Sequence, residues 1–597
     1  MEENPFLHGI SWTSAMEFAI RSINWMVALA FIAKANDNDN DNENLLKLSE
    51  KLQNGIINIT YYLTKHYSRF SSANNHLLVE ATAIGLAGYA FGHRPWQELA
   101  IRILTEEIEK QNYSDGVNKE LSLHYQTFGM EAYLLMAHAM QRNSGNHELR
   151  NLGNCHADEG ETKTAPDGKT LCNCVGLSPS SSACMSEIES DTSTSSVQRL
   201  SSSATHSAND STSCTPLQSD KPEKTFSATE GWMPMLRKEA EFVAHSTWRE
   251  KVVCEFGDDD EGKIIDLQGR PNDNASTCSA QAHNENDNSF HQWEWVLQLA
   301  SLVTGVRYSD FKTEHENIHW LFTEEEIENI KKLPYFASID NHESCIANRL
   351  SSRCFEVGGN TFLRDREDRV LIGIDHAELG FGSIAAHGHA DALSFQMLVD
   401  GEVVFADPGT YIYHCDLPAR NAFRKTINHN TLCLINENEN QNENRFIDQS
   451  KMLGAFMWGD RAVCTLEKWA SDEEKDILIA SHDGYKPIVH RRQFEWDKVG
   501  RRLTITDSLS EEAASVITFM LGSSIEVDIN DNHNENHNCI LLKGRSANVE
   551  LQFDGVNEIR IEDAELSPEY GVKVKTKAVR AYCSKGEVRT VIAIRLG

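Results

Sequence analysis

The spacing of apolar residues changes once along this chain, and that change limits the possible folds more than any other feature. Up to about residue 333, apolar side chains recur every three or four residues, as at Met16, Ile20, Ile23 and Val27. This is the period of an amphipathic helix. Beyond about residue 340, apolar and polar residues alternate in short runs separated by turn residues, which is the period of β-strands. We therefore predict a helical front part and an all-β back part.

The two parts divide into several expected elements. Helices are expected at residues 12–33, 45–66, 76–91, 96–109, 119–140, 232–248, 290–303 and 324–333. Because short loops join them, we expect antiparallel helical hairpins. Strands are expected at residues 361–362, 370–374, 393–398, 402–405, 462–465, 488–493, 502–508, 514–520, 539–542, 549–553, 572–578 and 588–594. So many short strands predict an antiparallel β-sandwich.

Composition marks the domain boundaries. Residues 141–228 are rich in Ser, Thr, Asn, Asp and Gly, and we predict a disordered insertion there. It separates a first helical part at 1–140 from a second at 229–338, and the β-sandwich follows at 339–597. Its Cys155-His156 and Cys172-x-Cys174 pairs match no common zinc-finger spacing. Four Asn-rich tracts (36–44, 283–288, 436–444 and 530–538) are expected in surface loops.

Charge and hydropathy exclude several classes of function. The 597 residues carry a net charge of -33, which argues against a general nucleic-acid or anionic-membrane binder. The longest unbroken apolar run, Trp25 to Ala33, is too short for a membrane span, so no integral membrane segment is expected. The N-terminus lacks the basic region of a signal peptide. The 14 cysteines follow no disulfide framework, so we expect mostly reduced thiols and leave the compartment open.

Histidines and carboxylates gather in the β part. The stretch His387-Gly-His389-Ala-Asp391 opens an expected strand at 392–399, the next strand (403–406) ends on Asp407, and a third (431–435) begins two residues after His429. Imidazole and carboxylate ligands on neighbouring segments are what a metal site needs. In an extended strand His387 and His389 would point to one side.

Three segments of the helical part could also carry chemistry. Asn75-His76 stands at the start of a helix, where Asn75 could serve as the N-cap. The run Glu120-x-Ser122-x-x-Tyr125 opens another helix. The acidic run at 255–263, which contains Gly257-Asp258, lacks the calcium-loop pattern. We interpret that run as a solvated acidic loop, with a loop that lines a cleft as the alternative.

Taken together, these segments resemble the heparinase II/III-like and alginate-lyase polysaccharide lyases. The resemblance extends to further segments in the same order: Asn4-Pro5, Gly9-Ile-Ser-Trp12, Asp407-Pro-Gly-Thr-Tyr-x-Tyr413, Arg424 and His429-Asn430-Thr431. It implies an incomplete N-terminal α/α toroid followed by a C-terminal antiparallel β-sandwich, with the active site in the cleft between them.

The resemblance also implies a reaction, β-elimination on a uronate-containing anionic polysaccharide. Asn75 and His76 would neutralise the uronate carboxylate as its C5 proton is lost. Tyr125 could serve as both base and acid if a cationic neighbour lowers its pKa, and His387 could act as base from the opposite face. The product would carry an unsaturated uronate.

Further roles follow from the same resemblance. Glu120, Tyr413 and Arg424 are expected to bind substrate, and a role in bracing the sandwich is the alternative for Arg424. One structural zinc would be bound by His389, Asp407 and His429. A departure from the family pattern is that Gln126 follows Tyr125, where a histidine is usual, while His124 precedes it.

Two other functions stay open from the sequence. One is a glycan-binding relative that has lost turnover. The other is a zinc hydrolase, in which the three metal ligands hold an activated water. The resemblance suggests a periplasmic or cell-envelope protein, although the cytoplasm remains an alternative. The oligomeric state is open, with a homodimer as one option.

Overall fold

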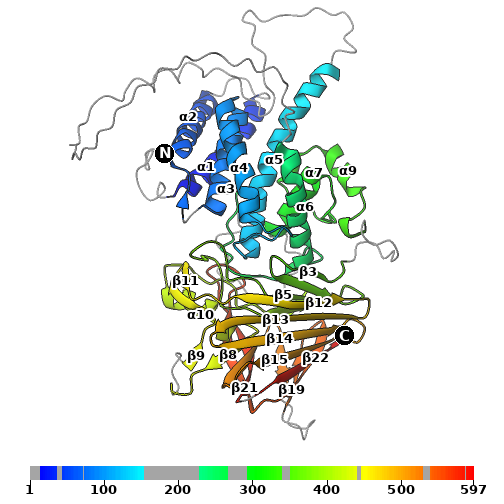
Figure 1. Cartoon of the computed structure of the whole chain (residues 1–597). Coiled ribbons are helices and arrows are strands. Elements are labelled where there is room, and N and C mark those ends of the chain that lie inside the picture. The colour runs from blue at the N-terminus through cyan, green and yellow to red at the C-terminus, as the bar shows by residue number, and fades with distance from the viewer. Residues whose placement is uncertain are drawn as a thin grey trace, which may run out of the picture.

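The helices and the sheets form two separate halves of the molecule. A computed structural model describes residues 14–36, 43–70, 73–152, 228–265, 292–338, 350–439, 445–528, 538–584 and 586–597. Figure 1 shows the helices packed side by side above a stack of sheets. The segments 1–13 and 153–227, together with most of the four Asn-rich tracts, lie outside the described residues.

The helical half is built from long helices that follow one another closely. Their bounds are α1 (Ala15–Asn36), α2 (Glu43–His66), α3 (Asn75–Ala90), α4 (Arg94–Gln111), α5 (Leu123–Leu152), α6 (Ala228–Ser246), α7 (Gln292–Thr304), α8 (Ile318–Leu321) and α9 (Glu324–Lys331). Each expected helix is present. Helix α5 continues to Leu152, beyond the domain boundary expected at residue 140.

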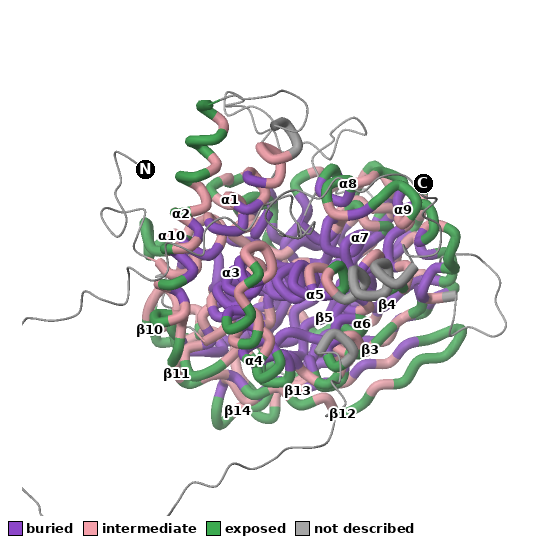
Figure 2. The backbone as a smooth tube through the Cα atoms, turned by 90° about the horizontal axis from the view of Figure 1, so that it is seen from above, coloured by how far each residue is buried: buried purple, intermediate pink, exposed green. Residues whose placement is uncertain are grey.

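Helices α3 and α5 form the centre of this half, as the buried tube in Figure 2 shows. Gly85 of α3 permits their close approach, because a Cβ there would lie 2.5 Å from Met136 Cε of α5 and 2.9 Å from Ala100 Cβ of α4. The first residues of α3 and α5 are thereby held next to each other. Both helices begin at the end of the toroid that faces the sheets (Figure 1).

Helix α1 is more apolar than expected for a surface helix. Among the described helices it is the one whose length and composition, over Ala15–Ala33, would suffice to cross a membrane. Length and composition alone do not distinguish a membrane span from a core helix, so the expectation of no integral membrane segment stays a prediction. A core helix meets the same criteria, and α1 buries Phe18, Ile23 and Leu29 in the helical core.

The β half contains three larger sheets, each with antiparallel neighbours. In spatial order, the first has β12 (Cys464–Ser471), β13 (Lys475–Tyr485), β14 (Ile488–Asp497), β15 (Arg502–Leu509), β22 (Val588–Leu596), β19 (Ala547–Asp554), β18 (Cys539–Lys543) and β17 (Glu526–Asp528). The second has β20 (Glu558–Leu566), β21 (Val574–Cys583), β16 (Ser515–Met520), β8 (Leu432–Ile435) and β9 (Phe446–Ile447). The third has β3 (Arg353–Phe355), β4 (Asn360–Arg364), β5 (Val370–Asp375), β6 (Phe395–Val399) and β7 (Glu402–Phe405). Two small hairpins pair β1 (Thr247–Trp248) with β2 (Val252–Val253), and β10 (Lys451–Gly454) with β11 (Met457–Gly459).

The β3–β7 sheet connects the two halves, because both of its faces are buried. Phe362 and Leu371 belong to the helical core, whereas their neighbours Leu363 and Ile372 belong to the core of the sandwich. Such strands have continuous apolar runs in place of alternation. The cleft between helices and sheets is thus bordered by a rigid, doubly buried layer. Figure 1 shows β3 and β5 directly beneath the helices.

Candidate active site and metal centre

Tyr125 and His387 lie face to face where the two halves meet. Tyr125 belongs to the first turn of α5, and His387 to the irregular loop before β6. Their ring centroids are 3.8 Å apart with an interplanar angle of 33°, and both side chains are largely buried. The structure therefore brings together two expected catalytic residues that are far apart in the sequence.

The Tyr125 hydroxyl has two oxygen neighbours. It lies 3.0 Å from the hydroxyl of Tyr413 and 3.3 Å from Asp260 Oδ2. Burial raises the pKa of the Tyr125 phenol well above its usual value, and the charge of Asp260 raises it further. The condition under which Tyr125 could also act as base, a cationic neighbour that lowers this pKa, is therefore not met, because the charged group in contact with the hydroxyl is a carboxylate.

Asp258 is the buried anion that fixes His387. Its Oδ2 lies 3.2 Å from His387 Nδ1, and its Oδ1 lies 3.0 Å from His389 Nε2. Arg420 binds both carboxylate oxygens. Burial alone would raise the pKa of Asp258, but Arg420 and the two histidines outweigh it and hold the pKa well below its usual range. Because Asp258 is fully buried, the interpretation of this run as a solvated loop was wrong, and the alternative of a loop that lines the cleft is the one observed.

Asn75 and Glu120 form a second buried group beside His387. Glu120 accepts hydrogen bonds from the Asn75 backbone N–H (3.1 Å) and from Asn75 Nδ2 (2.9 Å), and it also accepts one from Asn74 Nδ2 (3.0 Å). Its Oε2 lies 3.7 Å from His387 Nε2. Asn74, rather than Asn75, is the N-cap of α3, so Glu120 satisfies the first backbone donor of this helix.

His76 follows on the same turn of α3. Burial lowers its pKa, and Glu120, His387 and Asp260 are the charged groups that act on it. A small open pocket of about 70 Å³ borders this group. Its lining includes Glu120, His387 and the strongly exposed Phe70.

The positions of Gln126 and His124 explain the departure from the family pattern, in which a histidine is usual at the position that Gln126 occupies. Gln126 points away from Tyr413 and Asp260: its side chain donates to Gly116 O (3.2 Å) and accepts from Asn118 N (2.6 Å). His124 instead lies between Asp259 and Asp260. The histidine that precedes Tyr125 thus belongs to the site, and Gln126 holds a neighbouring turn.

Arg424 is fully buried and away from the pocket lining. Its Nη2 donates to Asn421 Oδ1 (2.6 Å) and to Gly454 O (2.9 Å), and its guanidinium lies over the Trp458 ring. These contacts fit the bracing alternative, and they do not place Arg424 where a substrate would touch it. Arg420, one turn earlier in α10 (Leu417–Arg424), is the arginine that reaches the site.

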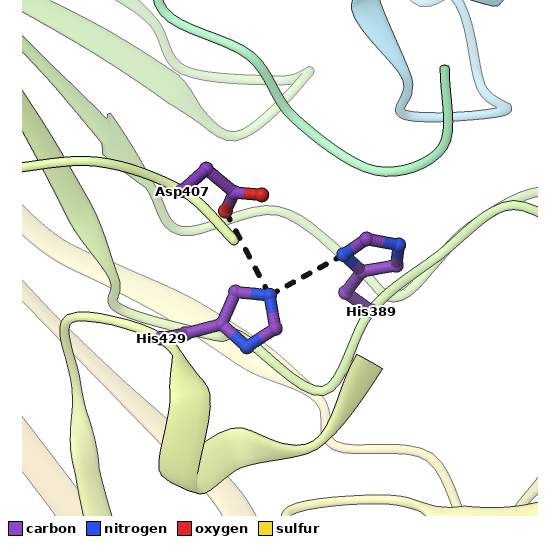
Figure 3. A group of neighbouring side chains, drawn as sticks. All are labelled: His389, Asp407 and His429. Atoms are coloured by element: carbon purple, nitrogen blue, oxygen red, sulfur yellow. Dashed lines mark hydrogen bonds and ion pairs between the residues drawn. The ribbon is translucent and has the colours of Figure 1, made fainter. Parts of the chain in front are cut away.

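The three expected metal ligands converge as predicted. One potential ligand atom from each of His389, Asp407 and His429 lies within 4.8 Å of the others. Figure 3 shows the three side chains pointing at one another. His389 Nδ1 is 3.3 Å and Asp407 Oδ2 is 3.7 Å from His429 Nε2.

The donor set fits a metal ion. The second ring nitrogen of His429 lies 2.9 Å from Lys425 O, and that of His389 faces Asp258. Such outer contacts orient the ligating nitrogens of metal-bound histidines. Burial lowers the pKa of His429 to about 4, so this imidazole is neutral at pH 7, as a ligand must be.

The His387-Gly-His389 stretch differs from the expectation in one respect. It is an irregular loop, and β6 begins only at Phe395, so the two histidines do not alternate along a strand. Both still face the same carboxylate, because Asp258 from the opposite loop lies between them.

Three residues of the site were missed as participants by sequence reasoning: Asp258, Asp260 and Arg420. The signal for the aspartates was available in the Gly257-Asp258 motif, but an acidic run looks solvated when no partner is visible. Arg420 lies on a short helix whose position is fixed only by tertiary contacts, so no local signal marked it. The seven cysteines in the described ranges are all free thiols, as expected for most of them.

Comparison with known families gives two matches along the chain. Residues 8–151 match the model described as heparinase II/III N-terminus, and residues 348–595 match the one described as heparinase II/III-like, C-terminal. Together the two cover more than half of the sequence. No curated protein matches the sequence.

Solved structures share the architecture. A heparinase III aligns with 100% of this chain and 71% of its own length, at 16% identity and a TM-score of 0.58. The heparan sulfate lyase HepC from Pedobacter heparinus aligns with 100% and 71%, at 15% identity and a TM-score of 0.56. Another heparinase III gives 17% identity and a TM-score of 0.54; 92% of this chain is covered, and the chain spans only 63% of that protein's length. These likenesses confirm the predicted fold, an incomplete α/α toroid followed by an antiparallel β-sandwich.

Proposed function

Because the chain belongs to the heparinase II/III-like family, we propose that it is a polysaccharide lyase that cleaves a uronate-containing anionic polysaccharide by β-elimination. The observation that carries the proposal is the Tyr125–His387 pair, with ring centroids 3.8 Å apart beside an open pocket. An acid and a base held that close suit a reaction that removes one proton and delivers another. The similarity to a heparan sulfate lyase favours a glycosaminoglycan among the possible substrates.

The carboxylate of the uronate has to be neutralised before its C5 proton becomes acidic. We assign this task to Asn75 and His76, whose donors stand at the start of α3 next to His387. Both oxygens of Glu120 accept from Asn75 Nδ2, each at 2.9 Å, so this carboxylate orients the Asn75 amide. A substrate carboxylate would have to compete with Glu120 for the two amide hydrogens.

His387 is the proposed base and Tyr125 the proposed acid. Asp258 at 3.2 Å fixes His387 Nδ1, so Nε2 is the nitrogen left to take the C5 proton. Tyr125, whose pKa is raised, stays protonated at neutral pH and can donate to the glycosidic oxygen that leaves C4. The electron pair of the C5–H bond then forms the C4–C5 double bond of an unsaturated uronate. Tyr413 at 3.0 Å orients the Tyr125 hydroxyl.

We assign one structural zinc to His389, Asp407 and His429. A metal there would add coordinate bonds between segments that hydrogen bonds already join, such as the one from Asn430 Nδ2 to Ala406 O at 2.9 Å. Among the described residues that line the pocket, none is one of these three. Their burial favours a structural role over that of an open hydrolytic zinc.

The proposal is tested with a panel of uronate polymers: heparan sulfate, hyaluronan, alginate, pectate and bacterial capsular polysaccharides. A lyase generates ultraviolet absorbance from the new double bond together with new reducing ends. New reducing ends without absorbance would reject elimination and favour hydrolysis. Binding without either product across the panel would favour the glycan-binding alternative.

A further inference from the structure

A buried histidine, paired with two partly exposed carboxylates, lies behind the Tyr125 hydroxyl and takes no part in the proton transfers of the proposed elimination. His124 lies between two carboxylates of the 255–265 loop. Its Nδ1 is 3.1 Å from Asp259 Oδ1, its Nε2 is 3.0 Å from Asp260 Oδ1, and its side chain is only 1% exposed. The side chains of Asp259 and Asp260 are 32% and 31% exposed, so only the imidazole is fully buried, and a charged imidazole is rarely buried without a specific function or a cost in stability.

Asp260 connects this pair to the reacting hydroxyl. One carboxylate oxygen, Oδ1, faces His124 and accepts the backbone N–H of Gly262 at 3.1 Å. The other, Oδ2, lies 3.3 Å from the Tyr125 hydroxyl. The carboxylate is therefore fixed on one side by the imidazolium and the backbone, and its free side faces the phenol.

We propose that Asp260, braced by His124, is a positioning residue that keeps the Tyr125 hydroxyl protonated and aimed, and so makes Tyr125 the general acid of the elimination. The inference rests on the proposed lyase function. In the reaction, His387 gains the C5 proton, the C4–O bond breaks, and the departing oxygen takes the Tyr125 proton. The phenolate that remains beside Asp260 is destabilised. As product leaves, it regains a proton from solvent, and His387 releases its proton to solvent.

Charge around the phenol supports this division of roles. The groups that face Tyr125 come from every neighbouring element: Asp258 and Asp260, Glu120, His124, His387, and Tyr413 with Arg420 over its ring. Arg420, His387 and His389 bind Asp258. His124 binds Asp260 on the side away from the phenol. Asp260 is the carboxylate in hydrogen-bond contact with the hydroxyl. A phenolate base at this position would have to form next to that carboxylate.

His124 is the cation that keeps Asp260 ionised. Burial opposes its charged form, but Asp259 and Asp260 outweigh burial and raise the pKa of His124 to about 9. The same contact lowers the pKa of Asp260 against the effect of its own burial. Asp260 therefore stays an anion over the pH range in which Tyr125 must stay neutral.

The test begins with the free protein, so that it does not depend on activity. The ionisation of Tyr125 is followed as the difference in phenolate absorbance between a protein and its Tyr125→Phe derivative. In the parent protein we expect no Tyr125 phenolate at the pH where ordinary tyrosines ionise. In Asp260→Asn we expect the Tyr125 pKa to fall by about 1 unit or more, the usual effect of removing a charge in contact.

Asp259→Asn is the matched control, because Asp259 contacts His124 from the same loop but not the Tyr125 hydroxyl. It should move the Tyr125 pKa less than Asp260→Asn does. Asp260→Ser serves as a second variant if Asp260→Asn fails to fold. An unchanged Tyr125 titration in the Asp260 variants, or an equal shift in Asp259→Asn, would overturn the proposal even for an active lyase.

The activity measurement separates an acid from a base. If Tyr125 is the acid, Asp260→Asn lowers its pKa, and the alkaline limb of the kcat profile moves to lower pH by about 1 unit. If Tyr125 is the base, the acidic limb moves instead, and the assignment is rejected. Absence of elimination on every polymer would refute the proposed function but leave the titration result standing.

Discussion

At the scale of single residues, the protonation states in the site depend on the charges that lie next to each titratable group. Tyr125 and His124 are adjacent in sequence, yet one is held neutral and the other charged. Asp260 contributes to both, because it contacts the phenol with one oxygen and the imidazole with the other; burial acts with it on the phenol, and Asp259 acts with it on the imidazole. Small substitutions there should change pKa values more than they change the fold.

Tyr125→Phe should lower kcat about 10²- to 10⁴-fold, the usual contribution of a general acid or base. The aromatic ring that stacks on His387 is kept, so the melting temperature should change little. Tyr133→Phe is the control. It removes another buried hydroxyl of α5, which donates to Leu104 O at 3.0 Å, and it should cost about 1 kcal/mol of stability without loss of activity. Full activity in Tyr125→Phe would refute the assigned role.

The His124 ion pair should make stability depend on pH. The pKa of His124 is about 9 in the folded protein and 6.5 as the reference value. Since the folded value is the higher one, the stabilisation is fully present below about pH 6.5 and is lost as pH rises through 9. It amounts to about 3 kcal/mol at most. The free energy of unfolding, followed from pH 6 to 9.5, should fall more steeply in the parent than in His124→Gln.

His319 offers a control for this pH dependence. It is also paired with carboxylates, Glu314 and Glu324, but its side chain is 36% exposed. Exposed pairs contribute little, so His319→Gln should keep the steep dependence of the parent. If His124→Gln keeps it as well, the buried pair is not its source.

At the scale of elements, two irregular loops bring their site residues to the first turns of α3 and α5. The loop that contains Asp258 and Asp260 follows β2, and the loop with His387 precedes β6. Gly257 is where these loops touch: its φ is 64°, and an added Cβ would lie 2.8 Å from both His387 O and Leu121 O. No side chain fits at this contact.

Gly257→Ala should therefore cost about 2–3 kcal/mol, from backbone strain together with the steric clash. It should also lower activity, because Asp258 would move away from His387. Gly305→Ala is a matched control. Gly305 has a similar φ of 69° but open space around it, so only the strain, about 1 kcal/mol, applies. Equal losses of stability in the two variants would show that the contact with His387 is unimportant.

At the scale of the whole molecule, the metal centre joins segments of different sheets. Asp407 follows β7 of the sheet that supports the helices, and His429 precedes β8 of the β16–β21 sheet. His389 lies in the loop of the catalytic His387. A metal ion would therefore tie the sandwich together directly beside the cleft.

His429→Ala should lower bound zinc, measured by elemental analysis, and the melting temperature together. His376→Gln is the control: His376 is also buried and contacts Thr361 Oγ1 at 2.9 Å, so stability should fall while zinc is retained. A chelator should inactivate the protein slowly, as the structure loosens. Immediate loss of turnover would favour a catalytic metal, and unchanged zinc in His429→Ala would reject the site.

Much of the fold could be predicted because helices and strands give apolar residues a regular spacing over short stretches of sequence. The helices at 45–66 and 76–91 were expected within a residue or two of α2 and α3. Strands buried on both faces, such as β5, were also found, since a continuous apolar run is itself a signal. The amphipathic strands β13 and β20 were missed. In β20 charged residues are interspersed with the apolar ones and hide the strand period, whereas the apolar run at residues 477–480 of β13 was a signal that sequence reasoning overlooked.

The sequence by itself determined the order of the two halves, the family pattern and the set of residues able to ligand a metal. The spacing of apolar residues and the residue types able to bind a metal can be recognised in the sequence without knowing which residues are in contact in the folded protein. Only the tertiary structure decided that Asp258 is buried, that His124 rather than residue 126 supplies the cation, and that Tyr125 is flanked by a carboxylate. Those properties depend on contacts between residues that are more than 100 positions apart in the sequence, such as Tyr125 with Asp260 and His387 with Asp258. Electrostatic energy depends on distance in space and on exclusion of water, and the order of residues along the chain specifies neither.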